Sequence, residues 1–315
     1  MAQMKIALSG FWENQIEDLS NKFPGAAFQA IDDENISDSD PDALVSLTQT
    51  ALDALFVPET LAQCASLKWV HASSAGIDEY LSLLGDAGFT LTCGKIIQGP
   101  NVADHGMSLL LALARRLPWH IRGAAPEDIP RPTELRGKRA LIIGFGGIGM
   151  SLAERCAAFG MHVEVVSETL MPIISFVERT YFGPQLLQAL PTADVVIIAA
   201  PGTPATNRMF NDEAFAAMKE SAYLINVSRG SIVDLDALVK TLEAGRLEAV
   251  GLDVTEPEPL PGNHPLRGFD RVLITPHIAG ITTTHERRFD LIHTNIDRFL
   301  NGHPLINIVD KNVGF

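Results

Sequence analysis

A glycine-rich turn between two regular elements constrains the fold of this chain more than any other feature. Gly144, Gly146 and Gly149 form a G-x-G-x-x-G pattern that directly follows the apolar stretch "ALII" and opens the helical stretch "GMSLAERCAAF". The first glycine permits a tight turn, the second lets the backbone approach a pyrophosphate, and the third allows close packing of helix on strand. The free N–H groups at the start of the helix attract phosphate. The pattern predicts dinucleotide binding, with glycines that serve packing alone as the alternative.

The remainder of the chain alternates short apolar runs with helical sequence, which predicts parallel sheets with helices on both faces. Continuous apolar runs, unlike alternating ones, suit strands that are buried on both faces. Long helices are expected at residues 101–117 and 284–300, and Asp234 and Gly245 are expected to cap the helix between them. The strand candidates outside the glycine-rich unit are residues 5–10, 51–57, 67–76, 89–94, 194–200, 223–228, 248–254 and 271–276.

Length and composition limit the class of protein. The 315 residues are enough for two domains, and 46% hydrophobic with 20% charged residues is typical of a globular protein. A formal net charge of -14 argues against nucleic acid as a partner. Cys64, Cys93 and Cys156 are scattered and odd in number, which favours reduced thiols over disulfides or a metal site. No apolar run suits a membrane span or a signal peptide, so we expect a cytoplasmic protein.

The strand after the glycine-rich helix bears on the choice of cofactor. Ser167 stands where NAD-binding folds usually place a carboxylate that binds the adenosine ribose, and Glu168 follows it. A 2′-phosphate would need a cation, yet no Lys or Arg occurs between Glu168 and Arg179. Glu168 would substitute for the usual acid and repel that phosphate, or it is simply a solvated loop charge. We expect NAD, with NADP as the alternative.

Three polar residues follow three of the predicted strands in the second half of the chain. Arg229 follows residues 223–228, Glu258 lies just past residues 248–254, and His277 follows residues 271–276. Ligands of open α/β sheets bind beyond the carboxyl ends of the strands. Histidine is a proton donor near neutral pH, a neighbouring carboxylate orients it, and arginine offers a planar fork to a carboxylate. Each residue alone also has an ordinary structural explanation, but together they suit the reduction of a ketone.

With these motifs in place, the sequence resembles the D-isomer-specific 2-hydroxyacid dehydrogenases. The segments "GFGGIG", "INVSRGSIVD", "GLDVTEPEP" and "TPHIAG" match the signatures of that family in order, and "SSAGID" and "NVADHG" match its weaker ones. The resemblance covers nearly the whole chain and implies that Arg229, Glu258 and His277 are the catalytic set. It also implies a Rossmann-type cofactor domain at residues 101–284 and a flavodoxin-like substrate domain at 1–100 plus 285–315, with a cleft between them.

The resemblance further implies contacts with the ligands. Backbone N–H groups of Ser74, Ala75 and Gly76 should bind the substrate carboxylate together with Arg229. Asp253 should meet the nicotinamide carboxamide and Val102 its ring, although Asp253 would equally suit a strand-end cap. Pro201 and Thr206 should flank the ribose or adenine, with a helix N-cap as the alternative for Thr206. The full set of expected cofactor contacts is Gly144, Gly146, Gly147, Ile148, Gly149, Ser167, Glu168, Pro201, Thr206, Val227, Asp253, Gly280 and Val102.

The expected reaction is the NAD(P)-dependent interconversion of a small 2-oxo acid and its D-2-hydroxy acid, by a homodimer without a metal. Residues 107–114 would serve as dimer interface or as core. Few cations mark the first domain, which favours glyoxylate, hydroxypyruvate or pyruvate over a phosphorylated acid. By analogy with the family that the sequence resembles, Phe11, Trp12, His285 and Arg288 are candidates for contact with the substrate side chain, with packing or surface roles as alternatives. The rival functions are a nucleotide-sensing corepressor and formate dehydrogenase, and Glu258, where the latter has glutamine, argues against the second.

Overall fold

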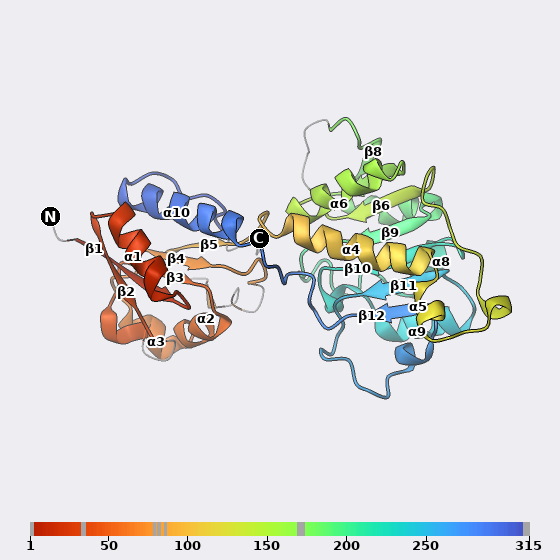
Figure 1. Ribbon diagram of the computed structural model, residues 1–315, viewed down its shortest axis with the longest axis horizontal. Helices are drawn as coiled ribbons and strands as arrows, with labels where there is room; N and C mark the ends of the chain where they lie inside the picture. The colour runs from red at the N-terminus through yellow and green to blue at the C-terminus, as the bar shows by residue number, and fades with distance from the viewer. Residues whose placement is uncertain are drawn as a thin grey trace. The chain divides into compact units, whose positions relative to one another are not determined.

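The computed structural model describes residues 3–32, 36–77, 80, 83–84, 87–168 and 174–310. The chain divides into two compact units (Figure 1), which we call unit 1 (Met1–Ile97 with Thr283–Phe315) and unit 2 (Gln98–Thr282). Each unit contains a parallel sheet with helices on both faces. This confirms the predicted α/β class with two doubly wound sheets.

Unit 1 is built on a five-stranded sheet with the order β2-β1-β3-β4-β5, in which every pair is parallel. This is the flavodoxin-like order, in which the topological switch point lies between β1 and β3. Its strands are β1 (Met4–Ser9), β2 (Ala26–Ala30), β3 (Ala43–Ser46), β4 (Trp69–Ala72) and β5 (Thr90–Cys93). Its helices are α1 (Glu13–Lys22), α2 (Gln49–Leu55), α3 (Pro58–Gln63) and α10 (Glu286–Leu300).

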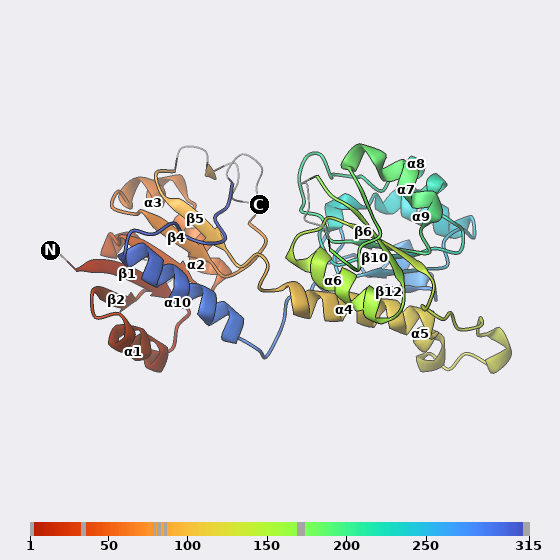
Figure 2. The ribbon, with the colours of Figure 1, turned by 90° about the horizontal axis from the view of Figure 1, so that it is seen from above.

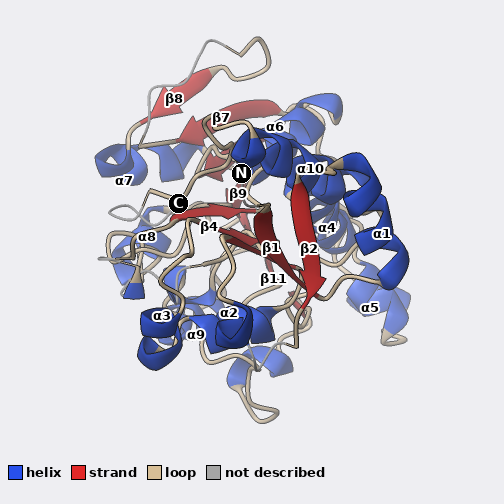
Figure 3. Ribbon diagram, turned by 90° about the vertical axis from the view of Figure 1, so that its left-hand side faces the viewer, coloured by secondary structure: helices blue, strands red, loops and turns tan. Residues whose placement is uncertain are grey.

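Two helices cover each face of this sheet. Helices α1 and α10 lie on one face and α2 and α3 on the other (Figures 1, 2 and 3). Leu19 of α1 and Ile292 and Ile296 of α10 share one buried cluster with Trp69 of β4. Helix α10 therefore returns from the far end of the sequence to complete the core of the N-terminal unit.

Unit 2 contains a seven-stranded sheet with the order β12-β11-β10-β9-β6-β7-β8, again entirely parallel. This order contains that of a dinucleotide-binding fold, with the switch point between β6 and β9. The strands are β6 (Arg139–Ile143), β7 (His162–Val166), β8 (Arg179–Tyr181), β9 (Val195–Ile198), β10 (Tyr223–Asn226), β11 (Ala249–Leu252) and β12 (Val272–Ile274).

The helices of unit 2 divide between the two faces of that sheet. One buried cluster contains residues of α4 and α6, and the other contains residues of α7, α8 and α9. Residues 107–114 contribute Met107, Leu109, Leu110 and Leu113 to the first cluster, so the core alternative for this segment is confirmed. The helices are α4 (Gly99–Ala114), α5 (Leu117–Ile121), α6 (Gly147–Ala158), α7 (Leu186–Ala189), α8 (Asp212–Ala217) and α9 (Leu235–Glu243).

One predicted strand is wrong. Residues 51–57 belong mainly to helix α2 instead. Thr48 caps this helix by accepting a hydrogen bond from the N–H of Ala51, and Ala51, Leu52 and Leu55 face the core. An apolar run of this length suits a buried strand and a buried helix equally well, and the cap decides between them. Both long helices were predicted correctly, although α4 begins and ends a few residues earlier than expected.

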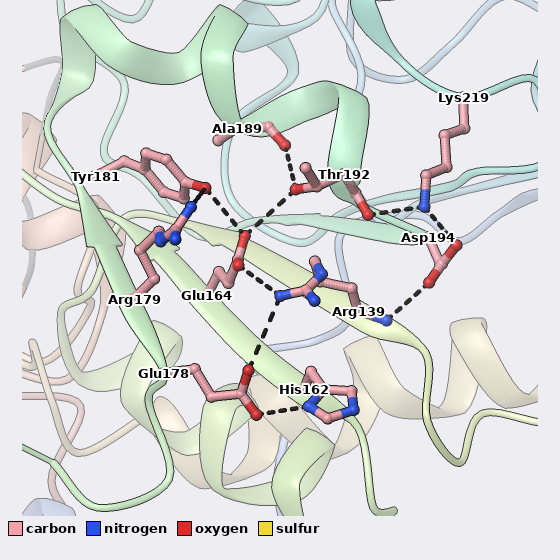
Figure 4. Close-up of polar contacts among 10 residues, drawn as sticks. All are labelled: Arg139, His162, Glu164, Glu178, Arg179, Tyr181, Ala189, Thr192, Asp194 and Lys219. Atoms are coloured by element: carbon pink, nitrogen blue, oxygen red, sulfur yellow. Dashed lines mark hydrogen bonds and ion pairs between the residues drawn. The ribbon is translucent and has the colours of Figure 1, made fainter.

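A buried carboxylate lies near the amino ends of the strands of unit 2 (Figure 4). Glu164 of β7 is 3% exposed and accepts a hydrogen bond of 2.6 Å from Nη1 of Arg139. The hydroxyl groups of Tyr181 and Thr192 each lie 3.4 Å from its second oxygen. Buried charges are stable in proteins only when they are paired in this way. These side chains lie near the amino ends of the strands, whereas the glycine-rich turn follows the carboxyl end of β6.

None of the helices in the described residues combines the length and the apolar character that crossing a bilayer requires.

Candidate active site

The glycine-rich turn connects β6 to the first turn of α6. Gly144 has φ +89°, and a Cβ atom there would lie 2.5 Å from Cα of Ala200. A Cβ on Gly149 would collide with the carbonyl oxygen of Gly144, so helix and turn are in direct contact. Gly146, by contrast, has open space where its Cβ would stand. Two of the glycines are thus required by the fold, and the third leaves room beside a helix N-terminus for a phosphate group.

The adjacent strand β7 ends beside this turn, because the N–H of Gly144 donates to the carbonyl of Val166. Ser167 is 6% exposed, whereas Glu168 is exposed. The carboxylate of Glu168 lies against Gly183, where any Cβ would collide with it. Arg179, the next cation along the chain, pairs in register with Glu164 and hydrogen-bonds to Tyr181 instead. The carboxyl end of β7 therefore presents an acid, displaced by one residue from its usual position.

The turn after β10 holds Arg229. The fully buried side chain of Asn226 donates to the carbonyl of Arg229 at 2.8 Å and accepts from the N–H of Ser228 at 3.1 Å. Gly202 lies beneath the aliphatic part of Arg229, because its Cβ would stand 2.9 Å from the arginine Cγ. Ser228 also donates to the carbonyl of Ala200. The half-buried guanidinium is therefore held by a turn that is fixed from both sides. Sequence analysis missed Asn226, although a polar residue at the end of an apolar strand was a visible signal.

His277 and Glu258 form a direct pair at the ends of β12 and β11. The imidazole Nδ1 lies 2.7 Å from Oε1 of Glu258, and the two side chains are 49% and 38% exposed. A carboxylate can only accept a hydrogen bond, so Nδ1 donates and Nε2 is left to exchange a proton. Strands β10, β11 and β12 are neighbours in the sheet. Arg229, Glu258 and His277 therefore follow the carboxyl ends of three adjacent strands.

Asp253 fixes the segment that carries His277. It is 1% exposed, and its carboxylate accepts hydrogen bonds from the hydroxyl of Thr275 at 2.6 Å and from the N–H groups of Ile278 and Ala279. His105 of α4 lies 3.2 Å from the same carboxylate. His277 has φ +53°, and its N–H donates to the carbonyl of Asp253. The strand-end cap considered for Asp253 is therefore present, and its contact with the nicotinamide stays a prediction. His105 was not identified from the sequence.

The other expected cofactor residues lie around the same edge of the sheet. Thr206 accepts a hydrogen bond from the N–H of Thr203 and donates to the carbonyl of Pro201, so it stabilises a turn. It does not cap α8, whose N-cap is Asn211, and that alternative is wrong. Val102 and Val227 are 4% and 5% exposed and pack in the core of unit 2. Gly147 and Ile148 open α6, and Gly280 is half-buried near Gln98.

The residues expected to bind the substrate carboxylate follow β4 in unit 1. Ser74, Ala75 and Gly76 are half-buried, and the hydroxyl of Ser74 donates to the carbonyl of Gly76 at 3.1 Å. The carbonyl of Ser74 accepts from the N–H of Gly94, which fixes the start of the loop. Arg229 belongs to unit 2, so the joint action of this loop and Arg229 on one substrate stays a prediction.

The sheet order and the glycine-rich turn define a dinucleotide-binding protein of the two-domain α/β class. Residues 107–279 match the model of "D-isomer specific 2-hydroxyacid dehydrogenase, NAD binding domain". The glyoxylate reductase of Thermofilum pendens is 32% identical over 297 residues, which cover 87% of this chain and 83% of that protein. The chain belongs to the D-isomer specific 2-hydroxyacid dehydrogenase family. It is accordingly an oxidoreductase that acts on CH–OH groups and contains a nicotinamide dinucleotide-binding domain.

Solved structures of the family agree over the whole chain. A family member from Aeromonas salmonicida has a TM-score of 0.81 at 28% identity, covering 98% of this chain and 100% of that one. Another from Xanthobacter autotrophicus, solved with NADPH and MES, has a TM-score of 0.80 at 26% identity and covers 99% of each chain.

Proposed function

We propose that this protein reduces a small 2-oxo acid to the D-2-hydroxy acid with NADH. The observation that carries the proposal is the His277–Glu258 pair of 2.7 Å at the carboxyl edge of a dinucleotide-binding sheet. Glyoxylate, hydroxypyruvate and pyruvate are the substrates to be tried first, and the similarity to a glyoxylate reductase supports the first of these.

Each residue of the site has a distinct role in this proposal. Arg229 binds the carboxylate and polarises the carbonyl of the substrate, because a guanidinium keeps its charge and offers a planar fork. The N–H groups of residues 74–76 bind the same carboxylate. His277 donates a proton from Nε2 to the carbonyl oxygen, and Glu258 orients the ring and stabilises the imidazolium. A reduced nicotinamide, when bound, would supply the hydride.

The cofactor would lie along the turn after β6. The open space at Gly146 and the N-terminus of α6 fit a pyrophosphate. NAD rather than NADP is supported by Glu168, because its exposed carboxylate would repel a 2′-phosphate at the end of β7. Arg179, which could have neutralised such a phosphate, instead forms its hydrogen bond with Tyr181 at the other edge of the sheet. We also propose that the protein acts as a homodimer, as expected from the family resemblance.

The test is a comparison of cofactors and substrates on one purified sample. The absorbance of the reduced nicotinamide would be followed with NADH and with NADPH, each against glyoxylate, hydroxypyruvate, pyruvate and phenylpyruvate. Faster turnover with NADH supports the role of Glu168. The variant Glu168→Gln should then show a smaller difference in turnover between NADH and NADPH. Strong preference for NADPH would overturn the cofactor assignment alone. No turnover with any acid would overturn the proposed reaction.

A further inference from the structure

A group of buried polar side chains lies under α10 at the carboxyl end of β4. Trp69, His71 and Ser73 alternate along the strand and its extension, so they share the face of the sheet that α10 covers. The ring of Trp69 lies 5.3 Å from that of Phe299, near the end of α10. The carboxyl-terminal end of α10 therefore lies near the amino end of β4.

Arg288 lies in the first turn of α10, at the opposite end of the helix from Phe299. The 12 residues from Arg288 to Phe299 span about 16 Å of helix, and Trp69 to Ser73 spans about 13 Å of extended chain, so the first turn of α10 is long enough to extend to the carboxyl end of β4. The charge of Arg288 acts on His71, where it adds to the effect of burial in lowering the pKa of the imidazole to about 4. Arg288 is half-buried, and its guanidinium has no hydrogen bond or ion pair within the described residues.

Two buried polar atoms of β4 and its extension have unused hydrogen-bonding capacity. His71 and Ser73 are 0% and 4% exposed, and neither Nε2 of His71 nor Oγ of Ser73 has a partner among the residues that the structure describes. Leaving a buried polar atom unpaired destabilises the folded protein, so such atoms are rare and usually have a functional or solvent-related reason.

The hydrogen bonds around His71 determine which nitrogen carries its proton. Oγ1 of Thr92 accepts from Nε1 of Trp69 at 2.9 Å and lies 2.9 Å from Nδ1 of His71. The carbonyl of Val70 is a poorer acceptor for the Thr92 hydroxyl, at 3.4 Å. The hydroxyl therefore donates to Nδ1, and the neutral ring carries its hydrogen on Nε2. Arg288, Ser73 and His71 then all present donors, which is the arrangement that an anion requires.

We propose that Arg288, Ser73 and His71 form a subsite for a second acidic group of the substrate, so that the preferred substrates are 2-oxo dicarboxylic acids. This inference rests on the proposed function, because Ser73 directly precedes the loop 74–76 that would bind the first carboxylate. One guanidinium with two neutral donors matches the single charge of a carboxylate better than the larger charge of a phosphate. The subsite also gives Arg288 a role that differs from the packing role of Phe289 beside it, whose ring meets that of Phe11 edge to face.

The test compares substrates that are matched in length. Reduction of oxaloacetate would be compared with that of 2-oxobutyrate, and 2-oxoglutarate with 2-oxopentanoate, with NADH throughout. The wild-type protein should have the higher kcat/KM for the diacid of each pair. Arg288→Met should lower kcat/KM for the diacids by about 10- to 100-fold and leave the monoacids nearly unchanged, as expected for the loss of a charge-assisted contact. Ser73→Ala should act in the same direction with a smaller loss.

Arg287→Met is the control, because it removes the same charge from the adjacent residue, which is exposed and donates to the carbonyl of Ile97. This variant should leave the ratio of diacid to monoacid unchanged. Tryptophan fluorescence and the Tm would verify that each variant folds. If Arg288→Met does not alter the ratio of kcat/KM for diacid to kcat/KM for monoacid, the subsite is overturned and the proposed reaction stays intact. A wild-type preference for the monoacids would have the same meaning. Failure to reduce any of the four acids would instead count against the proposed function itself.

Discussion

Glu258 holds the imidazole of His277 through a hydrogen bond of 2.7 Å to Nδ1, from a loop that follows the neighbouring strand. Glu258→Gln keeps the shape of the side chain and removes its charge, so the imidazolium loses the partner that stabilises it. We expect kcat to fall by about 100-fold while NADH binding is little changed. Glu256→Gln is the matched control, because Glu256 is an exposed carboxylate two residues earlier in the loop. Equal turnover of the two variants would show that Glu258 is not the partner.

Substitution of two glycines of the turn should have different effects, one on cofactor binding and the other on stability. Gly146→Ala places a methyl group in open space, so the Tm should stay close to that of the wild type. The same methyl group would stand where the pyrophosphate approaches, and the dissociation constant for NADH should rise by at least about tenfold, or about 1.4 kcal/mol. Gly149→Ala should instead lower the free energy of unfolding by about 1–3 kcal/mol, because its Cβ meets the carbonyl of Gly144. Equal effects of both variants on the Tm would contradict this division.

The buried His71 should make the stability of unit 1 depend on pH. Its pKa is lowered from 6.5 to about 4, mainly by burial, so the unfolded chain binds the proton more readily between these values. Stability is fully present above pH 6.5 and decreases as the pH falls towards 4, by at most about 1.4 kcal/mol per unit. Urea unfolding of a Trp12→Phe, Trp119→Phe protein, followed by the fluorescence of Trp69, would measure this. His71→Gln should reduce the slope, and an unchanged slope would assign it to other groups.

The pair of Arg139 and Glu164 should matter for stability and not for catalysis. Arg139→Met would leave a carboxylate that is 3% exposed without its cation (Figure 4). Because Arg139 is itself partly exposed, we expect a loss of about 1–3 kcal/mol, somewhat less than for a fully buried pair. Adding Glu164→Gln should recover part of that loss, and kcat should not change in either variant. Thermal unfolding and steady-state kinetics would measure both, and additive losses in the double variant would contradict the coupling.

The sequence allowed the sheets of both units to be predicted because their strands are continuous apolar runs. The caps at Asp234 and Gly245 were also predicted correctly: Asp234 accepts from two N–H groups of α9, and Gly245 has φ +74°. β2 and β8 were missed because most of their residues are exposed or half-buried. A short edge strand of this kind shows little hydrophobic periodicity. β3 is fully buried, yet its four residues are too short a run to stand out.

The site was predictable in part for a similar reason. Arg229, Glu258 and His277 stand at strand ends, where topology brings together residues that are far apart in the chain. Asn226 donates a hydrogen bond to the carbonyl of Arg229, and His105 contacts the hydroxyl of Thr275 and the carboxylate of Asp253. Such partners cannot be derived from spacing alone. The orphaned polar atoms of His71 and Ser73 depend on α10 returning from the end of the chain, a contact that no local pattern reveals.

The role of His277 as proton donor is tested most directly by the turnover of His277→Ala. The oxidation of NADH would be followed at saturating cofactor with the best 2-oxo acid of the panel, beside an equilibrium measurement of NADH binding. We predict that kcat falls by about 100- to 10,000-fold while the dissociation constant for NADH hardly moves. A variant with near-normal turnover would contradict the assignment of His277 and, with it, the proposed mechanism.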